Sequence, residues 1–300
     1  MKAKRKSQFS KYGRQDKIIL SIGYFLIALF VLAIIVPIFY IIVASFMDPV
    51  TLQNKGITFD FSKWTITAYQ RVMSNGAIWI GFKNAVIYSV VFTVVSVVVT
   101  LLAAYPMSRT DFKGRKLFNV IFVITMFFGG GLIPTYLLIS NLGLLDSMWA
   151  VILPGAFSVW NMIIAKTFMS GIPAAITESA KIDGANDIVI FIKLILPLSK
   201  PLIATLSLFS ALAYWNDWYN CMLYITKDNM FTLQYYLQRM LGNAEAMRIV
   251  AEKSGIALDT IPLESMKMAM TVVATGPIVL LYPFVQRYFV KGLTIGAVKG

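Results

Sequence analysis

Histidine is absent from the 300-residue sequence, and cysteine occurs once, at Cys221. A disulfide needs two cysteines and a His/Cys metal site needs several ligands, so neither can be assembled within this chain. Charge is scarce as well: charged residues make up 14% of the sequence, against about 25% in an ordinary soluble domain. Hydrophobic residues make up 58%. The composition indicates a protein whose main solvent is lipid.

The sequence also lacks a phosphate-binding loop of the form Gly-x4-Gly-Lys-Ser/Thr. We therefore predict no catalytic residue, no bound cofactor and no metal ion in this chain. The formal net charge is +13, which in a soluble protein would suggest nucleic acid. Here Lys and Arg flank apolar runs and form no basic stripe with interleaved aromatic residues, so no nucleic-acid binding is expected.

Long apolar runs dominate the chain. A helix that crosses the hydrocarbon core needs about 20 mostly apolar residues. On this rule we predict an all-α polytopic membrane protein with six transmembrane helices, at 18–46, 82–105, 117–139, 148–169, 201–226 and 268–290. The third run contains Gly129-Gly130-Gly131 and Pro134, which blur its ends.

Lys and Arg in the short connections collect on one side of these six runs, which identifies that side as cytoplasmic and places both termini there. The predicted organisation is a cytoplasmic tail at 1–17, a first transmembrane helix at 18–46, an external loop at 47–81, a core transmembrane domain at 82–290 and a cytoplasmic tail at 291–300. The core domain includes a cytoplasmic loop at 171–200 and an external loop at 227–267, where Thr232 to Met247 has the apolar spacing of an interfacial helix.

The cytoplasmic loop at 171–200 is unusual because its sequence predicts a folded helix, bend and helix. The defining positions are Pro173 at a first turn, a helix over 174–182, Asp183-Gly184 as the stop, Asn186 or Asp187 as the second cap, and Pro197 as the end. Such an element suits a groove on a partner protein. A solvated loop with helical character fits these residues equally well.

This segment resembles the loop of binding-protein-dependent ABC importer permeases, whose pattern is E-A-A, three residues, G, nine residues, I-x-L-P. The matching residues are Glu178-Ser179-Ala180, Gly184 and Leu194-Ile195-Leu196-Pro197. Ser179 replaces the usual Ala and Leu194 the usual Ile, both small changes. Asp183, Ala185, Phe191 and Pro201 fit the fuller form of sugar-type permeases.

Other segments carry the same resemblance. The tail from Tyr288 to Gly300 is similar to the C-terminus of the maltose-type second permease, and Ala104-Tyr105-Pro106 and Trp215-Asn216-Asp217 recur in that group. The run from Gly130 to Tyr136 resembles the branch linked with complex oligosaccharides.

The resemblance implies a type I ABC importer fold in which the cytoplasmic loop forms a coupling helix that docks on a separate ATPase. The implied coupling residues are Glu178, Ser179, Ala180, Asp183, Gly184, Ala185, Leu196 and Pro197. It further implies a bacterial cytoplasmic membrane, a second homologous permease, two copies of a cytoplasmic ATPase that hydrolyses the ATP, an external solute-binding protein and a carbohydrate substrate.

Asp217 is the only acidic residue well inside a predicted span, and such a residue is costly enough to suggest a functional position. On a continuous helix it would share a face with Tyr214, Trp218 and Cys221. A sugar could bond to polar groups and lie on aromatic rings here. The candidate substrate-path residues are Trp215, Asn216, Asp217, Trp218 and Tyr219. Alternatively, the aromatic rings form an interfacial belt and Asp217 caps or pairs within the bundle.

Two other functions remain open from the sequence. An ion-coupled secondary transporter or channel would be expected to carry paired ionisable residues near the membrane midplane, for which Asp217 alone is thin support. A scaffold that recruits a cytoplasmic partner without transport is the second alternative.

Overall fold

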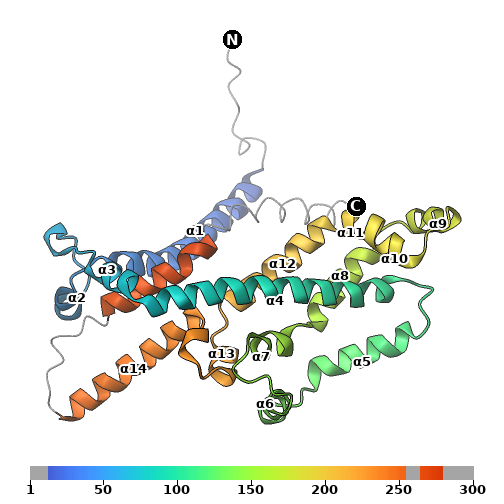
Figure 1. Ribbon diagram of the computed structural model, residues 1–300. Coiled ribbons are helices and arrows are strands. Elements are labelled where there is room, and N and C mark those ends of the chain that lie inside the picture. The colour runs from blue at the N-terminus through green and yellow to red at the C-terminus, as the bar shows by residue number, and fades with distance from the viewer. Residues whose placement is uncertain (1–12, 255–263, 280–300) are drawn as a thin grey trace. The chain divides into compact units, whose positions relative to one another are not determined.

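The computed structural model describes residues 13–254 and 264–279 (Figure 1). Within these ranges the chain is helical and contains no β-strand, only an isolated bridge between Met47 and Trp64. The all-α prediction is therefore confirmed. The described residues pack as two compact units, one of 13–72 with 264–272 and one of 73–254 with 273–279.

The first unit consists mainly of one long helix and the segment that follows it. Its elements are α1 (Arg14–Ser45), α2 (Pro49–Lys55), the 3-10 turn η2 (Phe61–Lys63) and α3 (Thr67–Ser74), together with part of a helix at 264–279. The most apolar stretch of α1 is only 6% buried. A small core of Val43, Ala44, Met47 and Leu52 lies at the C-terminal end of α1.

The second unit holds the remaining helices. They are α4 (Gly76–Ser108), α5 (Arg115–Phe127), α6 (Leu132–Asn141), α7 (Met148–Ile152), η3 (Leu153–Gly155), α8 (Val159–Ser170), α9 (Ala174–Ile182), α10 (Asp187–Ile190), the π-helical segment η4 (Phe191–Ile195), α11 (Leu196–Leu198), α12 (Lys200–Trp215), α13 (Tyr219–Tyr224), η5 (Asp228–Met230) and α14 (Leu233–Ser254).

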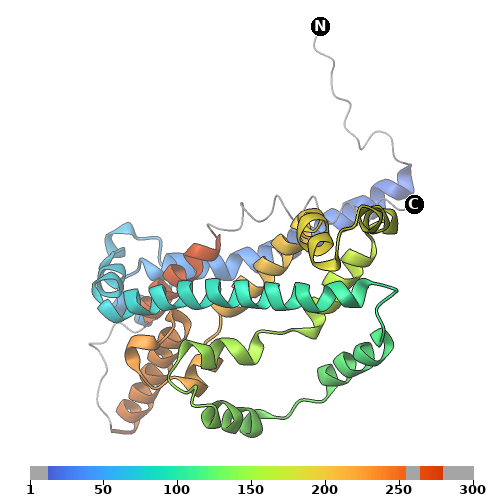
Figure 2. The same ribbon diagram turned by 45° about the vertical axis from the view of Figure 1, so that its right-hand side comes forward.

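Helix α4 runs the length of the second unit, with α8 and α12 packed along it (Figures 1 and 2). Its C-terminal half contributes Val97, Leu101, Ala104 and Met107 to the largest buried cluster. The other members come from α8, α12 and the segment that follows α9: Met162, Ala165, Met169, Ile190, Ile195, Leu202 and Leu206. One core therefore joins α4 to the segment at 171–200.

The predicted spans are only partly continuous. Gln15–Ser45 and Gly76–Ser108 are each long and apolar enough to cross a membrane. Three further candidates are bent pairs: α5 with α6 at 109°, α7–η3 with α8 at 54°, and α10–α11 with α12 at 78°. The residues described thus contain up to five candidate spans. The sixth, at 268–290, lies partly outside them, so the count of six stays a prediction.

The breaks have local causes. The run predicted at 117–139 divides where Gly131 adopts a left-handed φ of 88° ahead of Pro134. The run predicted at 201–226 ends its first helix at Trp215 and resumes at Tyr219, so the expected single helical face across 214–221 is wrong. Hydropathy reports only that a segment is apolar, and it does not distinguish a straight helix from a broken one.

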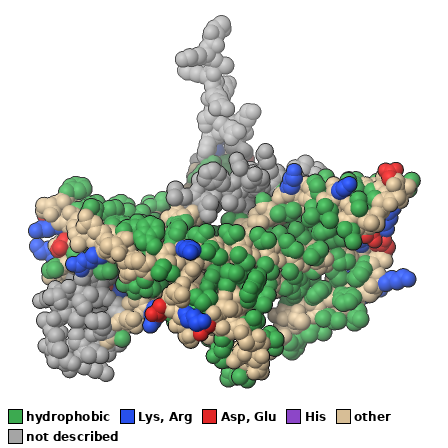
Figure 3. All heavy atoms as spheres, in the orientation of Figure 1, with side chains coloured by type: hydrophobic (Ala, Val, Ile, Leu, Met, Phe, Trp, Pro, Cys, Tyr) green, Lys and Arg blue, Asp and Glu red, His purple; other side chains and the backbone are tan. Residues whose placement is uncertain are grey.

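Apolar side chains cover most of the visible face, and charged side chains on it are few and scattered (Figure 3). Several of them gather over α9 and α10, near the C-terminal end of α4. This distribution is expected of a protein that presents apolar surface to lipid and charge to water.

Candidate functional site

The segment at 171–200 forms the predicted helix, bend and helix. Helix α9 covers Ala174–Ile182, and Asn186 caps α10 by accepting a 2.9 Å hydrogen bond from the Val189 backbone N–H. Of the two cap candidates, Asn186 is therefore the cap. Asp187 becomes the first residue of α10, where a carboxylate is favoured by the helix dipole. The second helix continues through a π-helical segment to Leu198, one residue beyond the predicted end.

The bend between α9 and α10 depends on Gly184, whose φ of 82° lies in the left-handed region. The Gly184 N–H donates to the Lys181 carbonyl at 3.0 Å, and the Ala185 N–H donates to the Ala180 carbonyl at 2.9 Å. These two bonds form a Schellman motif that closes α9. Ala180 and Ala185 also pack on the core that contains α4, so the bend is fixed on its inner side.

The predicted coupling residues divide between an outer and an inner side. Glu178, Ser179, Asp183 and Gly184 are exposed, whereas Ala180, Ala185 and Leu196 are half-buried against the core and Pro197 is exposed beyond it. Two apolar side chains on the outer side were not predicted from the sequence: Ile182 is 86% exposed and Ile188 is 69% exposed. The sequence pattern that could have indicated them is an isoleucine on each side of the polar bend at Asp183-Gly184.

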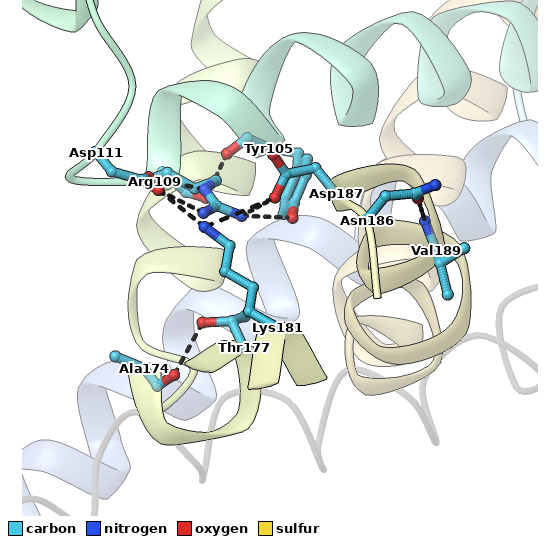
Figure 4. Close-up of polar contacts among 10 residues, drawn as sticks. Tyr105, Arg109, Asp111, Ala174, Thr177, Lys181, Asn186, Asp187 and Val189 are labelled. Carbon is cyan, nitrogen blue, oxygen red and sulfur yellow. Dashed lines mark hydrogen bonds and ion pairs between the residues drawn. The ribbon is translucent and has the colours of Figure 1, made fainter. Parts of the chain in front are cut away.

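Four charged side chains tie this segment to the end of α4 (Figure 4). Arg109, the residue after α4, binds Asp111 through two hydrogen bonds, Nε to Oδ1 at 2.9 Å and Nη2 to Oδ2 at 2.6 Å. Its Nη1 donates to Asp187 Oδ1 at 2.7 Å and to the Tyr105 hydroxyl at 3.0 Å. Lys181 of α9 donates to Asp111 Oδ2 at 3.2 Å. We call Arg109, Asp111, Lys181 and Asp187 the ionic cluster.

The ionic cluster shifts the titration of its members. The hydrogen bond from Arg109 holds the pKa of the Asp111 carboxyl far below its usual value, and Lys181 lowers it further. The same contact with Asp111 raises the pKa of the Arg109 guanidinium. In the sequence, Arg109 and Lys181 count only among the Lys and Arg of the short connections that predict the orientation of the chain. The ionic cluster forms only where the end of α4, α9 and α10 meet, so no local sequence pattern indicates it.

The second candidate site lies where α12 stops and α13 begins. Asp217 accepts a 3.2 Å hydrogen bond from the Asn220 N–H through Oδ1, so it caps α13. Its Oδ2 is buried and has no hydrogen-bond partner among the described residues. The Thr232 hydroxyl donates to the Asp217 backbone carbonyl at 3.3 Å. Asp217 therefore acts as a helix cap, which is one of the two roles that the sequence allowed for it. Capping uses Oδ1 and leaves Oδ2 without a hydrogen bond to the described residues.

The aromatic residues around this break differ in exposure. Trp215 is buried, its Nε1 donates to the Ala274 carbonyl at 3.0 Å, and its ring meets Phe82 of α4 edge to face. Trp218 is half-buried and Tyr219 is 44% exposed, with their rings perpendicular. Asn216 is exposed and donates to the Leu212 carbonyl at 2.8 Å. Of the predicted substrate-path residues, Asn216 and Tyr219 thus present the most open surface.

No set of three or more His, Cys, Asp or Glu side chains lies where it could hold a metal ion, within the residues that the structure describes. The sites are thus a folded helix–bend–helix held to the end of a long apolar helix, and an aromatic break that packs on the same helix. Together with the candidate spans, they define a helical membrane protein of the permease class.

Known proteins with similar sequences are permeases of transport systems. The chain is 39% identical over 277 residues to the polygalacturonan/rhamnogalacturonan transport system permease protein YtcP of Bacillus subtilis (strain 168), covering 92% of this chain and 96% of that protein. It is 31% identical over 287 residues to the arabinooligosaccharides transport system permease protein AraQ of Halalkalibacterium halodurans, covering 94% of this chain and 96% of that protein. No protein-family model matches the sequence.

A solved structure agrees. The fold matches a chain of a bacterial ABC transporter involved in the import of the acidic polysaccharide alginate, with a TM-score of 0.81, 28% identity, and coverage of 93% of this chain and 99% of that chain. The chain therefore belongs to the family of ABC transport system permeases, and the resemblance seen in the sequence is confirmed. The C-terminal tail that contributed to the resemblance lies outside the described residues.

Proposed function

We propose that this chain is one of two permease subunits of an ATP-driven carbohydrate importer, and that a separate ATPase supplies the energy. The observation that carries the coupling role is the α9–Gly184–α10 element, which is folded, fixed to the core on one side and exposed on the other. Ile182 and Ile188 offer apolar anchors on the exposed side, beside the polar groups of Glu178 and Asp183.

The proposed assembly contains this permease, a second homologous permease, two copies of a cytoplasmic ATPase and an external solute-binding protein. It lies in a bacterial cytoplasmic membrane, with both termini and the segment at 171–200 on the cytoplasmic side. The chain itself holds no ATP and hydrolyses none, because its sequence contains no phosphate-binding loop.

The proposed substrate is an oligosaccharide. The relatives described above are named for transport of polygalacturonan/rhamnogalacturonan and of arabinooligosaccharides, and the matched structure for import of the acidic polysaccharide alginate. At the break between α12 and α13, Asn216 and Tyr219 provide an exposed amide and an exposed ring. A carbohydrate needs such a combination, since its hydroxyls hydrogen-bond and its ring faces are apolar. Asp217 adds a buried carboxylate oxygen that has no hydrogen-bond partner within the part of the chain that the structure describes.

An ion-coupled transporter is not favoured. Asp217 caps a helix, and in the part of the chain that the structure describes no acidic cluster accompanies it. The family relationship also points to ATP-driven systems.

The test is purification in mild detergent, identification of every copurified chain, and reconstitution of the complex in proteoliposomes. Uptake is then measured for galacturonan oligomers, arabino-oligosaccharides and maltodextrins, with and without ATP on the ATPase side. We expect uptake of at least one of these that requires both ATP and the copurified ATPase. Uptake by this chain alone, driven by a proton or sodium gradient, would contradict the proposal.

A further inference from the structure

We propose that Arg109 is a positioning residue that makes the α9–α10 segment and the C-terminal end of α4 move as one body, so that movement of the segment reaches the transport path through α4. The inference rests on the proposed coupling function and adds the element that transmits the movement.

The ionic cluster includes a residue on each side of the bend. Lys181 lies in the last turn of α9, and Asp187 is the first residue of α10, with Gly184 between them. Arg109 reaches Asp187 directly at 2.7 Å, and it reaches Lys181 through Asp111, which both cations contact. The cluster holds two cations and two carboxylates, so its formal charges cancel. It therefore fixes the angle at the bend as well as the distance to α4.

The geometry of Arg109 suits this role. Its side chain is 17% exposed, whereas those of Asp111, Asp187 and Lys181 are 56%, 62% and 44% exposed. Isolated exposed ion pairs contribute little, but a forked guanidinium that engages two carboxylates is stronger and directional. Arg109 also lies over the ring of Tyr105, 5.7 Å from its centroid. A lysine could replace the charge of Arg109 but not this set of contacts.

An apolar contact runs parallel to the ionic one. The Tyr105 ring meets Phe191 of the π-helical segment, with centroids 4.9 Å apart. Ile190 and Ile195 on either side of Phe191 are buried in the core with Leu101 and Ala104 of α4. The segment is thus attached to α4 at Arg109 and at Tyr105, one helical turn apart, and two attachments resist rotation better than one.

Helix α4 connects this end to the break between α12 and α13. Phe92 of α4 stacks on Tyr214 and Phe82 meets Trp215 edge to face. Phe92 and Tyr105 are separated by about 20 Å along a continuous helix, at about 1.5 Å per residue. Packed helices shift as rigid elements between discrete arrangements, so displacement at Arg109 displaces the packing at Phe92.

The test measures sugar imported per ATP hydrolysed by the reconstituted complex, using whichever of the three oligosaccharide probes the wild type imports. For Arg109→Gln we expect the ATPase to copurify and to hydrolyse ATP, while sugar imported per ATP falls about five-fold or more. Arg109→Lys should be intermediate. An unchanged ratio in Arg109→Gln overturns the inference, whatever happens to stability.

A matched pair of lysines provides the second arm. Lys181→Gln removes the contacts of Lys181 with Asp111 and Asp187. Lys193→Gln makes the same change in charge at an exposed residue that forms no ion pair with any residue that the structure describes. We expect a lower ratio in Lys181→Gln and a wild-type ratio in Lys193→Gln. If Arg109→Gln fails to assemble, this pair decides: equal ratios in the two variants overturn the inference.

The wild type separates the two proposals. If the wild-type complex imports no probe with ATP, the proposed function fails. If it imports sugar normally and the variants retain its ratio, only the inference about Arg109 fails. Melting temperatures of the purified complexes distinguish a loss of transmission from a loss of folding. If the ionic cluster serves stability alone, the variants should have a lower melting temperature and an unchanged amount of sugar imported per ATP.

Discussion

The two regions that α4 connects are held by different forces. At its C-terminal end, charged side chains and helix caps add to the buried apolar core in holding the α9–α10 segment. Along its N-terminal half, buried rings and hydrogen bonds to backbone carbonyls predominate, as in the 3.2 Å bond from the Tyr88 hydroxyl to the Met230 carbonyl. A change at the first region should therefore affect transmission more than stability, and a change at the second should affect stability or substrate.

The largest effect is expected at Gly184. Its left-handed φ costs about 1–2 kcal/mol for a residue with a Cβ, and a β-branched side chain fits it worst. Gly184→Val should therefore reorient α9 against α10 and lower ATP-driven uptake about ten-fold or more, with normal levels of the protein in the membrane. Gly184→Asn is the control, because asparagine tolerates this conformation. Normal uptake by the valine variant would contradict the proposed coupling role of the α9–Gly184–α10 element.

A second effect separates the two roles of Asp217. Asp217→Asn keeps the Oδ1 acceptor that caps α13 and removes the charge, whereas Asp217→Ala removes both. If the carboxylate contacts sugar, Asp217→Asn should keep the melting temperature and weaken apparent sugar affinity about ten-fold, the range of a hydrogen bond to a charged group. Wild-type affinity in the asparagine variant, with lower stability only in the alanine variant, would reduce Asp217 to a cap.

Packing at the aromatic region gives a third prediction. A Cβ on Gly155 would collide with the hydroxyl of Tyr214, which donates to the Val151 carbonyl at 3.0 Å. Gly155→Ala should cost about 1–3 kcal/mol of stability, the usual range for overpacking. Adding Tyr214→Phe should recover part of that loss, so the double-mutant cycle measures the collision. Gly76→Ala is the control, since no atom of the described residues beyond its own helical turn and chain neighbours lies within 4 Å of its added Cβ.

The smallest effect concerns pH. The pKa of Asp111 is lowered in the folded protein, so its contribution to stability is present above the ordinary carboxyl pKa and is lost only as the pH falls through the lowered value. The difference in melting temperature between wild type and Asp111→Asn should hence stay constant from pH 8 to pH 5. No difference at any pH within this interval would show that the ionic cluster does not stabilise the protein in solution.

The same contrast explains what the sequence could predict. The bounds of α9, the stop at Asp183-Gly184 and the cap at Asn186 follow from short-range rules of helix termination, and the structure confirms them. The apolar spans were recognisable because lipid demands them.

The remaining features depend on distant partners. Arg109 meets Asp187 across 78 positions of sequence, so no local pattern indicates the pair. The break at 216–218 lies within an apolar run, where hydropathy does not distinguish a capped turn from a continuous helix. The roles of the coupling and substrate-path residues stay predictions, as do the domain bounds and the cytoplasmic location of both termini.

The most direct test of the central claim asks what the outer side of α9 touches. Cys221→Ser removes the sole cysteine, after which Ile182→Cys and Phe59→Cys each provide one thiol, at side chains that are 86% and 65% exposed. A short thiol-reactive crosslinker should join position 182 to the copurified ATPase, and position 59, on the predicted external loop, should not reach it. No crosslink from position 182, or a crosslink to the ATPase from position 59, would contradict the account.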